Sequence, residues 1–154
     1  MTTDWQHRLF ISRFDGVGAW LTTVVRVVTG VLFVSFSTGK FTDHMMESVD
    51  FERYGLPWPD GAVYLAGTVE LVGGLLLLVG LLTRPAALVL ACNMVVAIAT
   101  AGRVEGGTFH LGVGPAMLVA MLFLVWAGPG HLAVDHRLGR GLPPGPPSGV
   151  NAAG

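Results

Sequence analysis

The stretch from Tyr64 to Arg84, YLAGTVELVGGLLLLVGLLTR, constrains this chain more than any other part of it. Its apolar run is long enough, at ~1.5 Å per helical residue, to cross a hydrocarbon core of ~30 Å. The one charged side chain inside the run is Glu70. An unpaired carboxylate at membrane depth costs about 3 kcal/mol even on lenient insertion scales, so we expect Glu70 to face a partner, a water pocket or a site.

The composition excludes a soluble protein. Of the 154 residues, 52% are hydrophobic and only 12% are charged, and the mean hydropathy is +0.64. A soluble domain carries about 25% charged residues. The nine Lys and Arg residues form no basic stripe, which argues against nucleic-acid binding. The single cysteine, Cys92, excludes a disulfide, a CxxC redox pair and a cysteine-based metal site within this chain.

Four apolar segments predict an all-α, integral membrane four-helix bundle. The expected spans are Val17 to Gly39, Ala62 to Leu82, Ala86 to Ala101 and Phe109 to Ala127. Residues 17–136 would form this bundle, after an interfacial N-terminal segment at 1–16. The Pro- and Gly-rich residues 137–154 predict a disordered tail. Pro115 is expected either to kink the fourth helix or to mark its true start.

The loop between the first two spans, residues 41–60, is rich in acids and aromatic residues. This pattern predicts an amphipathic cap at the membrane interface. A membrane anchor is the simpler interpretation of the cap, and a lid over a site is the alternative.

Polar side chains fall on the faces of the expected helices. In the first helix, residues spaced +4, +3, +4 and +3 share one face: Arg26, Gly30, Phe33, Ser37 and Lys40. Such a face does not favour lipid and should point into the bundle. Asn93 in the third helix adds an amide at membrane depth, where helix-to-helix hydrogen bonding is the simpler role. His110 adds an imidazole at the start of the fourth helix, where an interfacial position is the simpler explanation.

The basic residues predict that both termini face the cytoplasm. That orientation places five arginines inside, Arg8, Arg13, Arg84, Arg137 and Arg140, against Lys40, Arg53 and Arg103 outside. Counting residues from the inner boundary then puts Arg26 at a depth of ~13 Å and Glu70 at ~18 Å. We therefore expect an Arg26–Glu70 charge pair, with Lys40 extending toward the outer surface.

Four groups of residues carry a resemblance to a known family. They are RVVTGVLFVSFSTGK from Arg26 to Lys40, Gly55 to Pro57, VELVGGLLLLVGLLTR from Val69 to Arg84, and GPGHLAVD from Gly128 to Asp135. Together they resemble the DoxX family of small four-helix bacterial membrane proteins, including DoxD-like members. The chain departs from that family's pattern in its tail and at Ala133, where a serine is expected.

The resemblance implies a multi-pass protein of the bacterial inner membrane, linked to sulfur, thiol or oxidative-stress redox chemistry. It suggests the membrane component of a quinone-linked oxidoreductase system, with a protein partner or a homo-oligomer in the bilayer. The expected cofactor is a quinone, menaquinone or ubiquinone, and no haem or metal is expected. Candidate cofactor-binding residues are those that offer a donor or a proton carrier: Arg26, Lys40, Glu70, Asn93 and His110.

Two alternatives stay open at the level of sequence. The first is a non-enzymatic membrane scaffold, in which buried charges set helix register and exposed faces bind a partner. The second is a carrier of a small solute or lipid, against which the lack of an inverted repeat counts. The sequence contains no flavin or nicotinamide motif and no iron–sulfur cysteine set, so in the redox interpretation electrons come from a partner.

Overall fold

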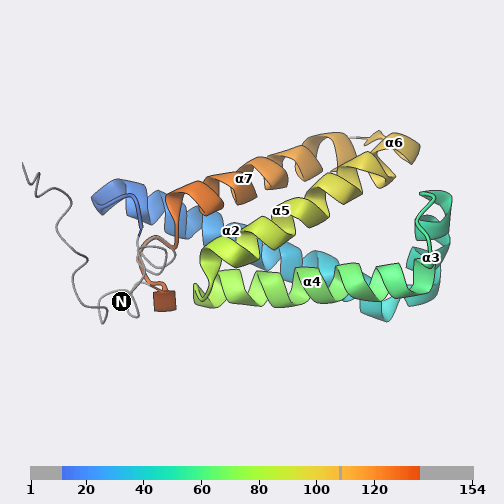
Figure 1. The fold of residues 1–154 in the computed structure, drawn as a ribbon, viewed down its shortest axis with the longest axis horizontal. Helices are drawn as coiled ribbons and strands as arrows, with labels where there is room; N and C mark the ends of the chain where they lie inside the picture. Colours follow the sequence, from blue (N-terminus) through green and yellow to red (C-terminus); the bar gives the residue numbers. More distant parts are fainter. Residues whose placement is uncertain (1–11, 108, 136–154) are drawn as a thin grey trace, which may run out of the picture.

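A computed structural model describes residues 12–107 and 109–135. The expected N-terminal segment lies mostly outside the described residues, and the expected tail lies wholly outside them. All regular structure in the described part is helical (Figure 1). The elements are α2 (Gly16–Thr42), α3 (His44–Arg53), α4 (Pro59–Val79), α5 (Thr83–Ala99), α6 (Ala101–Val104), the π-helical turn η1 (Phe109–Val113) and α7 (Gly114–Ala127).

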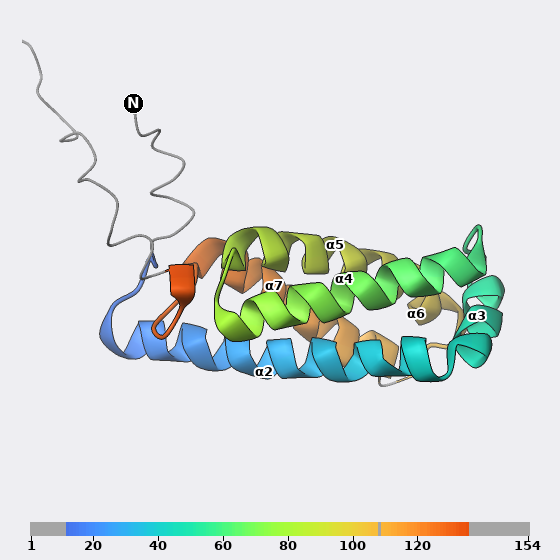
Figure 2. The same cartoon turned by 90° about the horizontal axis from the view of Figure 1, so that it is seen from below.

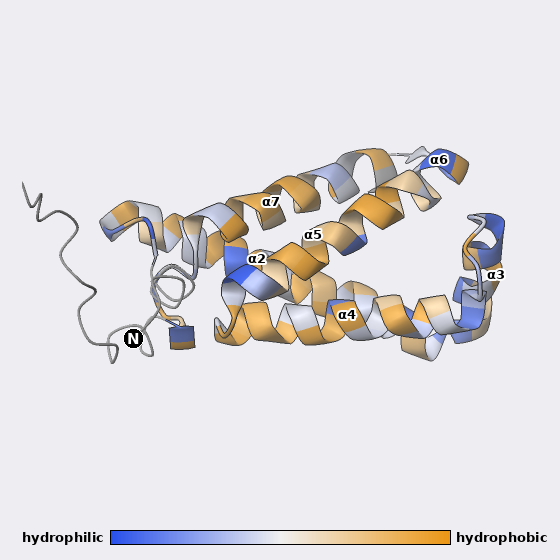
Figure 3. Cartoon of the chain, in the orientation of Figure 1, coloured by the Kyte–Doolittle hydropathy of each residue, from blue (hydrophilic) through white to orange (hydrophobic). Residues whose placement is uncertain are grey.

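The predicted all-α membrane bundle is confirmed. Within the described residues, three helical segments are long and apolar enough to cross a bilayer, and a shorter apolar helix occupies Leu111–Ala127. The three long segments are α2, α4 and Thr83–Val104. Figure 3 shows hydrophobic residues along these helices and hydrophilic residues over α3 and α6 at one end.

The observed helix boundaries refine the expected ones. The loop at residues 41–60 contains a ten-residue helix, α3, at the position of the expected interfacial cap. Pro115 lies in the first turn of α7, directly after the π-helical turn η1. A proline is tolerated there because the first turn of a helix leaves its N–H groups unused. Pro115 therefore marks the start of the α-helix.

The helices form two antiparallel pairs, in which α2 packs along α4 and α5 packs along α7 (Figures 1 and 2). The N–H of Arg13 donates to the carbonyl of Ala127 at 2.9 Å. The described start of the chain therefore lies beside the end of α7, as an even number of crossings requires.

Glycines set how α2 and α4 face each other. A Cβ added to Gly30 would lie 3.0 Å from the backbone oxygen of Gly74, and a Cβ added to Gly74 would lie 3.0 Å from that of Gly30. Small residues permit such close helix contact inside membranes. Any larger side chain would separate the helices, so this contact fixes their register. The apolar core lies beside it and includes Phe33, Leu77, Leu90, Met121 and Leu124.

The segment after α7, residues 128–135, folds back over the turn that joins α4 to α5. The buried carboxylate of Asp135 accepts the N–H groups of Leu82 and Thr83, both at 2.8 Å. The N–H of Asp135 donates in return to the carbonyl of Gly80 at 2.9 Å. The N-cap residue of α5 is Leu82, whose side chain cannot accept a hydrogen bond. A carboxylate from the far end of the chain therefore caps α5.

We predict that Asp135→Asn lowers the free energy of unfolding by about 1–3 kcal/mol, because an amide offers one acceptor oxygen and leaves a buried N–H unsatisfied. A lower unfolding temperature in detergent would check this. The matched control is Asp60→Asn, whose side chain is 74% exposed and which should change little. Equal effects of the two substitutions would contradict the capping role.

Candidate functional site

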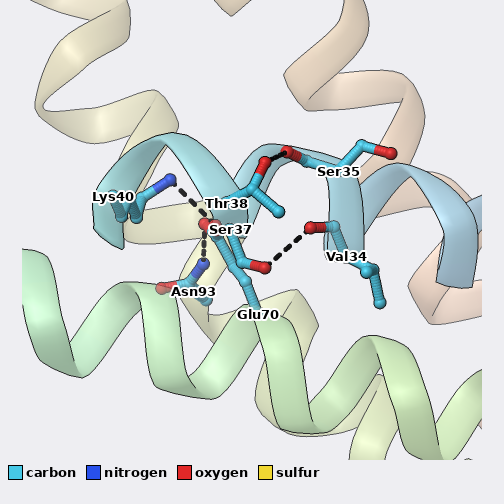
Figure 4. A network of polar contacts seen from close by, with 7 residues as sticks. All are labelled: Val34, Ser35, Ser37, Thr38, Lys40, Glu70 and Asn93. Carbon is cyan, nitrogen blue, oxygen red and sulfur yellow. Dashed lines mark hydrogen bonds and ion pairs between the residues drawn. The ribbon is translucent and has the colours of Figure 1, made fainter. Parts of the chain in front are cut away.

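Glu70 lies on α4 and ties three helices together. Its Oε2 accepts a hydrogen bond from Nζ of Lys40 on α2 at 2.8 Å, which is also an ion pair. Its Oε1 accepts a hydrogen bond from Nδ2 of Asn93 on α5 at 2.9 Å. Figure 4 shows the three side chains converging from their separate helices. Both carboxylate oxygens therefore have a donor, as expected for a charge at membrane depth.

Burial makes these contacts important for the fold. The side chains of Lys40 and Glu70 are only 14% and 6% exposed. Removing one partner from such a pair leaves an uncompensated buried charge, which costs more than losing an exposed salt bridge. The Asn93 amide adds a hydrogen bond that needs no second charge. The cluster of Lys40, Glu70 and Asn93, here called the polar triad, is thus neutral overall.

The expected Arg26–Glu70 pair is wrong. The contact between Gly30 and Gly74 sets the register of the two antiparallel helices, and in that register Arg26 faces Gly80, at the end of α4. Ten residues of helix, or ~15 Å, separate Gly80 from Glu70 along the chain. The guanidinium of Arg26 cannot serve as the partner across that distance.

The expected Arg26–Glu70 pair assumes that Val17 and Leu82, the inner ends of the first two predicted spans, lie at the same depth in the membrane. In the structure, the first turns of α2 extend well beyond the end of α4 (Figure 1). In the observed register, Lys40 lies against Gly67, whose added Cβ would be 3.1 Å from the Lys40 Cβ. Glu70 is one helical turn from Gly67. Lys40 therefore points inward to Glu70 instead of outward to the membrane surface.

Arg26 has a different role at the opposite end of the bundle. It is 1% exposed, and its Nη2 donates to the carbonyl of Leu132 at 3.2 Å. Its Nη1 occupies the space that a Cβ at Gly80 would need, and Gly80 has a positive φ of 72°. Thr23 supports the same contact by donating to the carbonyl of His131 at 2.9 Å. Arg26 therefore anchors residues 128–135 and does not belong to the polar triad.

A cavity of about 360 Å³ opens beside the polar triad, between the two helix pairs and α3. Lys40, Glu70 and Asn93 all line it. Its apolar wall includes Phe36, Met94, Ala97, Val113 and Met117. Pockets that bind small molecules are commonly ~300–1,000 Å³ and mostly apolar, with a few polar groups that orient the ligand. The cavity has these properties.

Tyr54, at the end of α3, and Glu105, beyond α6, both line the mouth of the cavity. Burial, followed by the interaction with the Glu105 carboxylate and by the nearby negative charges of Asp50 and Glu47, raises the pKa of Tyr54 above its ordinary value. Tyr54 therefore stays protonated at physiological pH. The two residues bring α3 and the segment after α6 together at the mouth.

His44 and its neighbours do not form a catalytic triad. The Oγ of Ser48 lies 3.3 Å from Nε2 of His44, and Oδ1 of Asp60 lies 3.6 Å from the same nitrogen. A nucleophilic triad needs the serine on one ring nitrogen and the acid on the other. The His44 ring instead stacks on Tyr64 with centroids 4.0 Å apart, which fixes α3 against α4.

Three of the five predicted site residues, Lys40, Glu70 and Asn93, meet in one place, while Arg26 lies at the other end. His110 lies in η1, and its side chain is outside the described residues. The prediction missed Tyr54 and the Glu105 carboxylate at the mouth. The mixture of acids and aromatic residues at positions 41–60 was the available signal for Tyr54, through the alternative of a lid, whereas Glu105 lies in a later loop that carried no such signal.

Comparisons with known proteins identify the relatives of this chain. The model of the DoxX family matches residues 21–103. An uncharacterized membrane protein of Mycobacterium tuberculosis is 36% identical over 130 residues, covering 75% of this chain and 80% of the relative. An uncharacterized protein of Haemophilus influenzae is 32% identical over 121 residues, covering 73% and 87%. The Bacillus subtilis protein named "Putative oxidoreductase CatD" is 28% identical over 114 residues, covering 74% and 84%. No solved structure matches the chain significantly.

We predict that Lys40→Met lowers the free energy of unfolding by about 3–5 kcal/mol, because the Glu70 carboxylate loses its cation. Combining Lys40→Met with Glu70→Gln should restore part of this loss. The effects of Arg26→Gln and Glu70→Gln should simply add, because those residues share no contact. Chemical unfolding in detergent would measure both cycles. Coupling of Glu70 to Arg26 but not to Lys40 would contradict the observed pairing.

We also predict that Tyr54→Phe speeds amide hydrogen exchange in α3 by about two- to tenfold, because the side chain loses its interaction with the Glu105 carboxylate. Exchange measured by mass spectrometry would check this. The control is Tyr64→Phe, which keeps the aromatic ring that stacks on His44. If the two variants gave the same α3 exchange, the interaction of Tyr54 with Glu105 would not stabilise α3.

Proposed function

This chain belongs to the DoxX family, and from that premise we propose that it is the membrane component of a quinone-linked oxidoreductase system. The observation that carries the proposal is the position of the polar triad. Hydrogen-bond donors and a carboxylate line a largely apolar cavity within the membrane-spanning helices. In this proposal a quinone head group, menaquinone or ubiquinone, binds in that cavity.

The residues of the cavity fit a quinone head group. A quinone carbonyl accepts hydrogen bonds, so its site needs N–H or O–H donors. The Lys40 ammonium has three N–H groups and the Asn93 amide has two, and each uses one on Glu70. Further N–H groups are thus available on both side chains. The neutral polar triad and the apolar wall of Phe36 and Met94 also suit an uncharged ring.

The polar triad can also handle protons. When bound, a quinone supplies a two-electron acceptor whose reduction takes up two protons. The Lys40 ammonium can donate one proton to the bound ring. The Glu70 carboxylate can then take up a proton from water at the cavity mouth and pass it to the Lys40 amine across 2.8 Å, and a second such cycle supplies the second proton. Asn93 does not titrate, so in this proposal it orients the carboxylate and the ligand.

The electrons come from a partner protein in this proposal. The sequence contains no flavin or nicotinamide motif and only one cysteine, so this chain supplies no electron carrier of its own. The name of the Bacillus subtilis relative, "Putative oxidoreductase CatD", supports a redox setting. The resemblance to the DoxX family suggests sulfur, thiol or oxidative-stress chemistry for that partner. A homo-oligomer is the other assembly that we consider.

The proposed location is the bacterial inner membrane, with both termini in the cytoplasm. The described start of the chain and the end of α7 lie together, and Arg13 and Arg84 lie at that end. The positive-inside rule favours the cytoplasm for it. The cavity and α3 then face the opposite side. A partner that reaches the cavity mouth from water would act from that outer side.

We predict that the purified protein binds quinone at about one per chain and that Asn93→Ala weakens binding about tenfold, the worth of one hydrogen bond. Asn93→Ala leaves the ion pair of Lys40 and Glu70 intact. The control is Cys92→Ala, on the neighbouring exposed residue. Mass spectrometry of the organic extract and equilibrium binding of added menaquinone would measure both variants.

The rival interpretation is a scaffold, in which the polar triad only holds α2, α4 and α5 together. A wild-type protein that carries no quinone and binds none when it is added would contradict the proposed function. A stoichiometric protein partner found in its place would favour the scaffold. Loss of quinone from Asn93→Ala and its retention by Cys92→Ala would favour the redox site.

A further inference from the structure

The cavity reaches the side of the bundle as well as its end. α4 and α5 lie close together near the turn that joins them and separate toward α3 (Figure 1). At the close end, a Cβ added to Gly73 would lie 2.8 Å from the Leu90 side chain. One turn further, the hydrogen bond from Asn93 to Glu70 bridges the two helices. Beyond that bridge, the space between them belongs to the cavity.

Two small or branched residues border this space. Ala66 on α4 and Val96 on α5 both line the cavity. Val96 is also 50% exposed. Both residues lie within segments that are long and apolar enough to span a membrane. A cavity-lining side chain that keeps half of its surface accessible lies at the rim of the cavity, so the opening toward the side of the bundle is the rim beside Val96, where α4 and α5 separate (Figure 1).

We propose that this opening is a lateral portal between the cavity and the bilayer. A quinone enters through it to reach the polar triad, and its isoprenoid tail extends back through it into the lipid. The inference rests on the proposed quinone site and specifies where the ligand lies. A cavity of about 360 Å³ accommodates a ring, but a long isoprenoid chain must leave it. The portal gives the tail an apolar exit between α4 and α5, next to the hydrogen bond that joins Glu70 and Asn93.

The contacts at the mouth favour the lateral route. Tyr54 and Glu105 line the end that faces water. The acidic side chains of Glu47 and Asp50 line the same end. An isoprenoid tail that left by this end would pass these charged groups and enter water. This would cost free energy, because the apolar surface of the tail would lose its burial. The portal beside Val96 presents no charge to the tail.

A second hollow, of about 440 Å³, lies on the other side of α5, and Val95, Leu111 and Leu118 are among its lining residues. Ile98 borders both this outer hollow and the cavity. Its side chain packs against Gly114, where an added Cβ would be 3.3 Å away. Ile98 therefore forms a wall between the two spaces, and the tail cannot pass from one to the other without moving it.

Two adjacent valines make a matched test. Val95 and Val96 are the same residue type and are 53% and 50% exposed, but Val96 lines the cavity and Val95 lines the outer hollow. The variants are Val96→Trp and Val95→Trp, which both extend a side chain that is already exposed. The ligands are a menaquinone with an isoprenoid tail and menadione, the same ring without the tail. Equilibrium binding in detergent gives four affinities to set against those of the wild type.

The portal predicts that Val96→Trp weakens binding of the tailed menaquinone by about tenfold more than it weakens binding of menadione, because only the tail passes the rim beside Val96. Val95→Trp should leave both affinities unchanged. Selective loss in Val95→Trp would place the tail in the outer hollow and overturn the portal. An equal loss of both ligands in Val96→Trp, or no effect of either variant, would overturn it as well. A wild-type protein that binds neither ligand would instead remove the proposed quinone site, and the portal with it.

Discussion

A carboxylate at membrane depth must be paired, and the rest of this structure depends on how Glu70 meets that requirement. Its two oxygens accept one N–H from α2 and one from α5, so a single side chain connects the three segments that, in the described part of the chain, are long and apolar enough to cross a bilayer. Lys40 has to turn inward to make its contact, and Asn93 has to face α4. The side chains that donate to Glu70 also line the cavity. The residues that hold the helices together are therefore the same residues that can contact a ligand.

The two ends of the bundle are built differently. At one end, Asp135 caps α5, Arg26 packs against Gly80, and residues 128–135 close over the helix turn. At the other end α4 and α5 separate, and α3 lies at this open end (Figure 1). The tight end fixes the positions of the helices, which lets the open end keep a cavity without losing the fold. Arg26 and Lys40 thus lie on one face of α2 but make their contacts at opposite ends of the bundle.

The sequence was sufficient to predict the four apolar helices, because hydrophobic length is a strong signal in membranes. It also showed that Glu70 needs a partner, but not which one. Helix register depends on the close contact of Gly30 with Gly74. An error of a few turns in the assumed helix ends was enough to predict Arg26, in place of Lys40, as the partner of Glu70. The cavity mouth brings together Tyr54 and Glu105, which are 51 positions apart in the sequence, and no local pattern predicts that they lie near each other.

The central claim is that the cavity beside the polar triad is a quinone site, and photolabelling tests it most directly. An azido-quinone would be irradiated with the purified protein, and the labelled peptides would be identified by mass spectrometry. The proposal predicts labels near Lys40, Ala66 and Val96 that an excess of unlabelled quinone removes. Labels scattered over the lipid-facing surface, unchanged by that competitor, would contradict it.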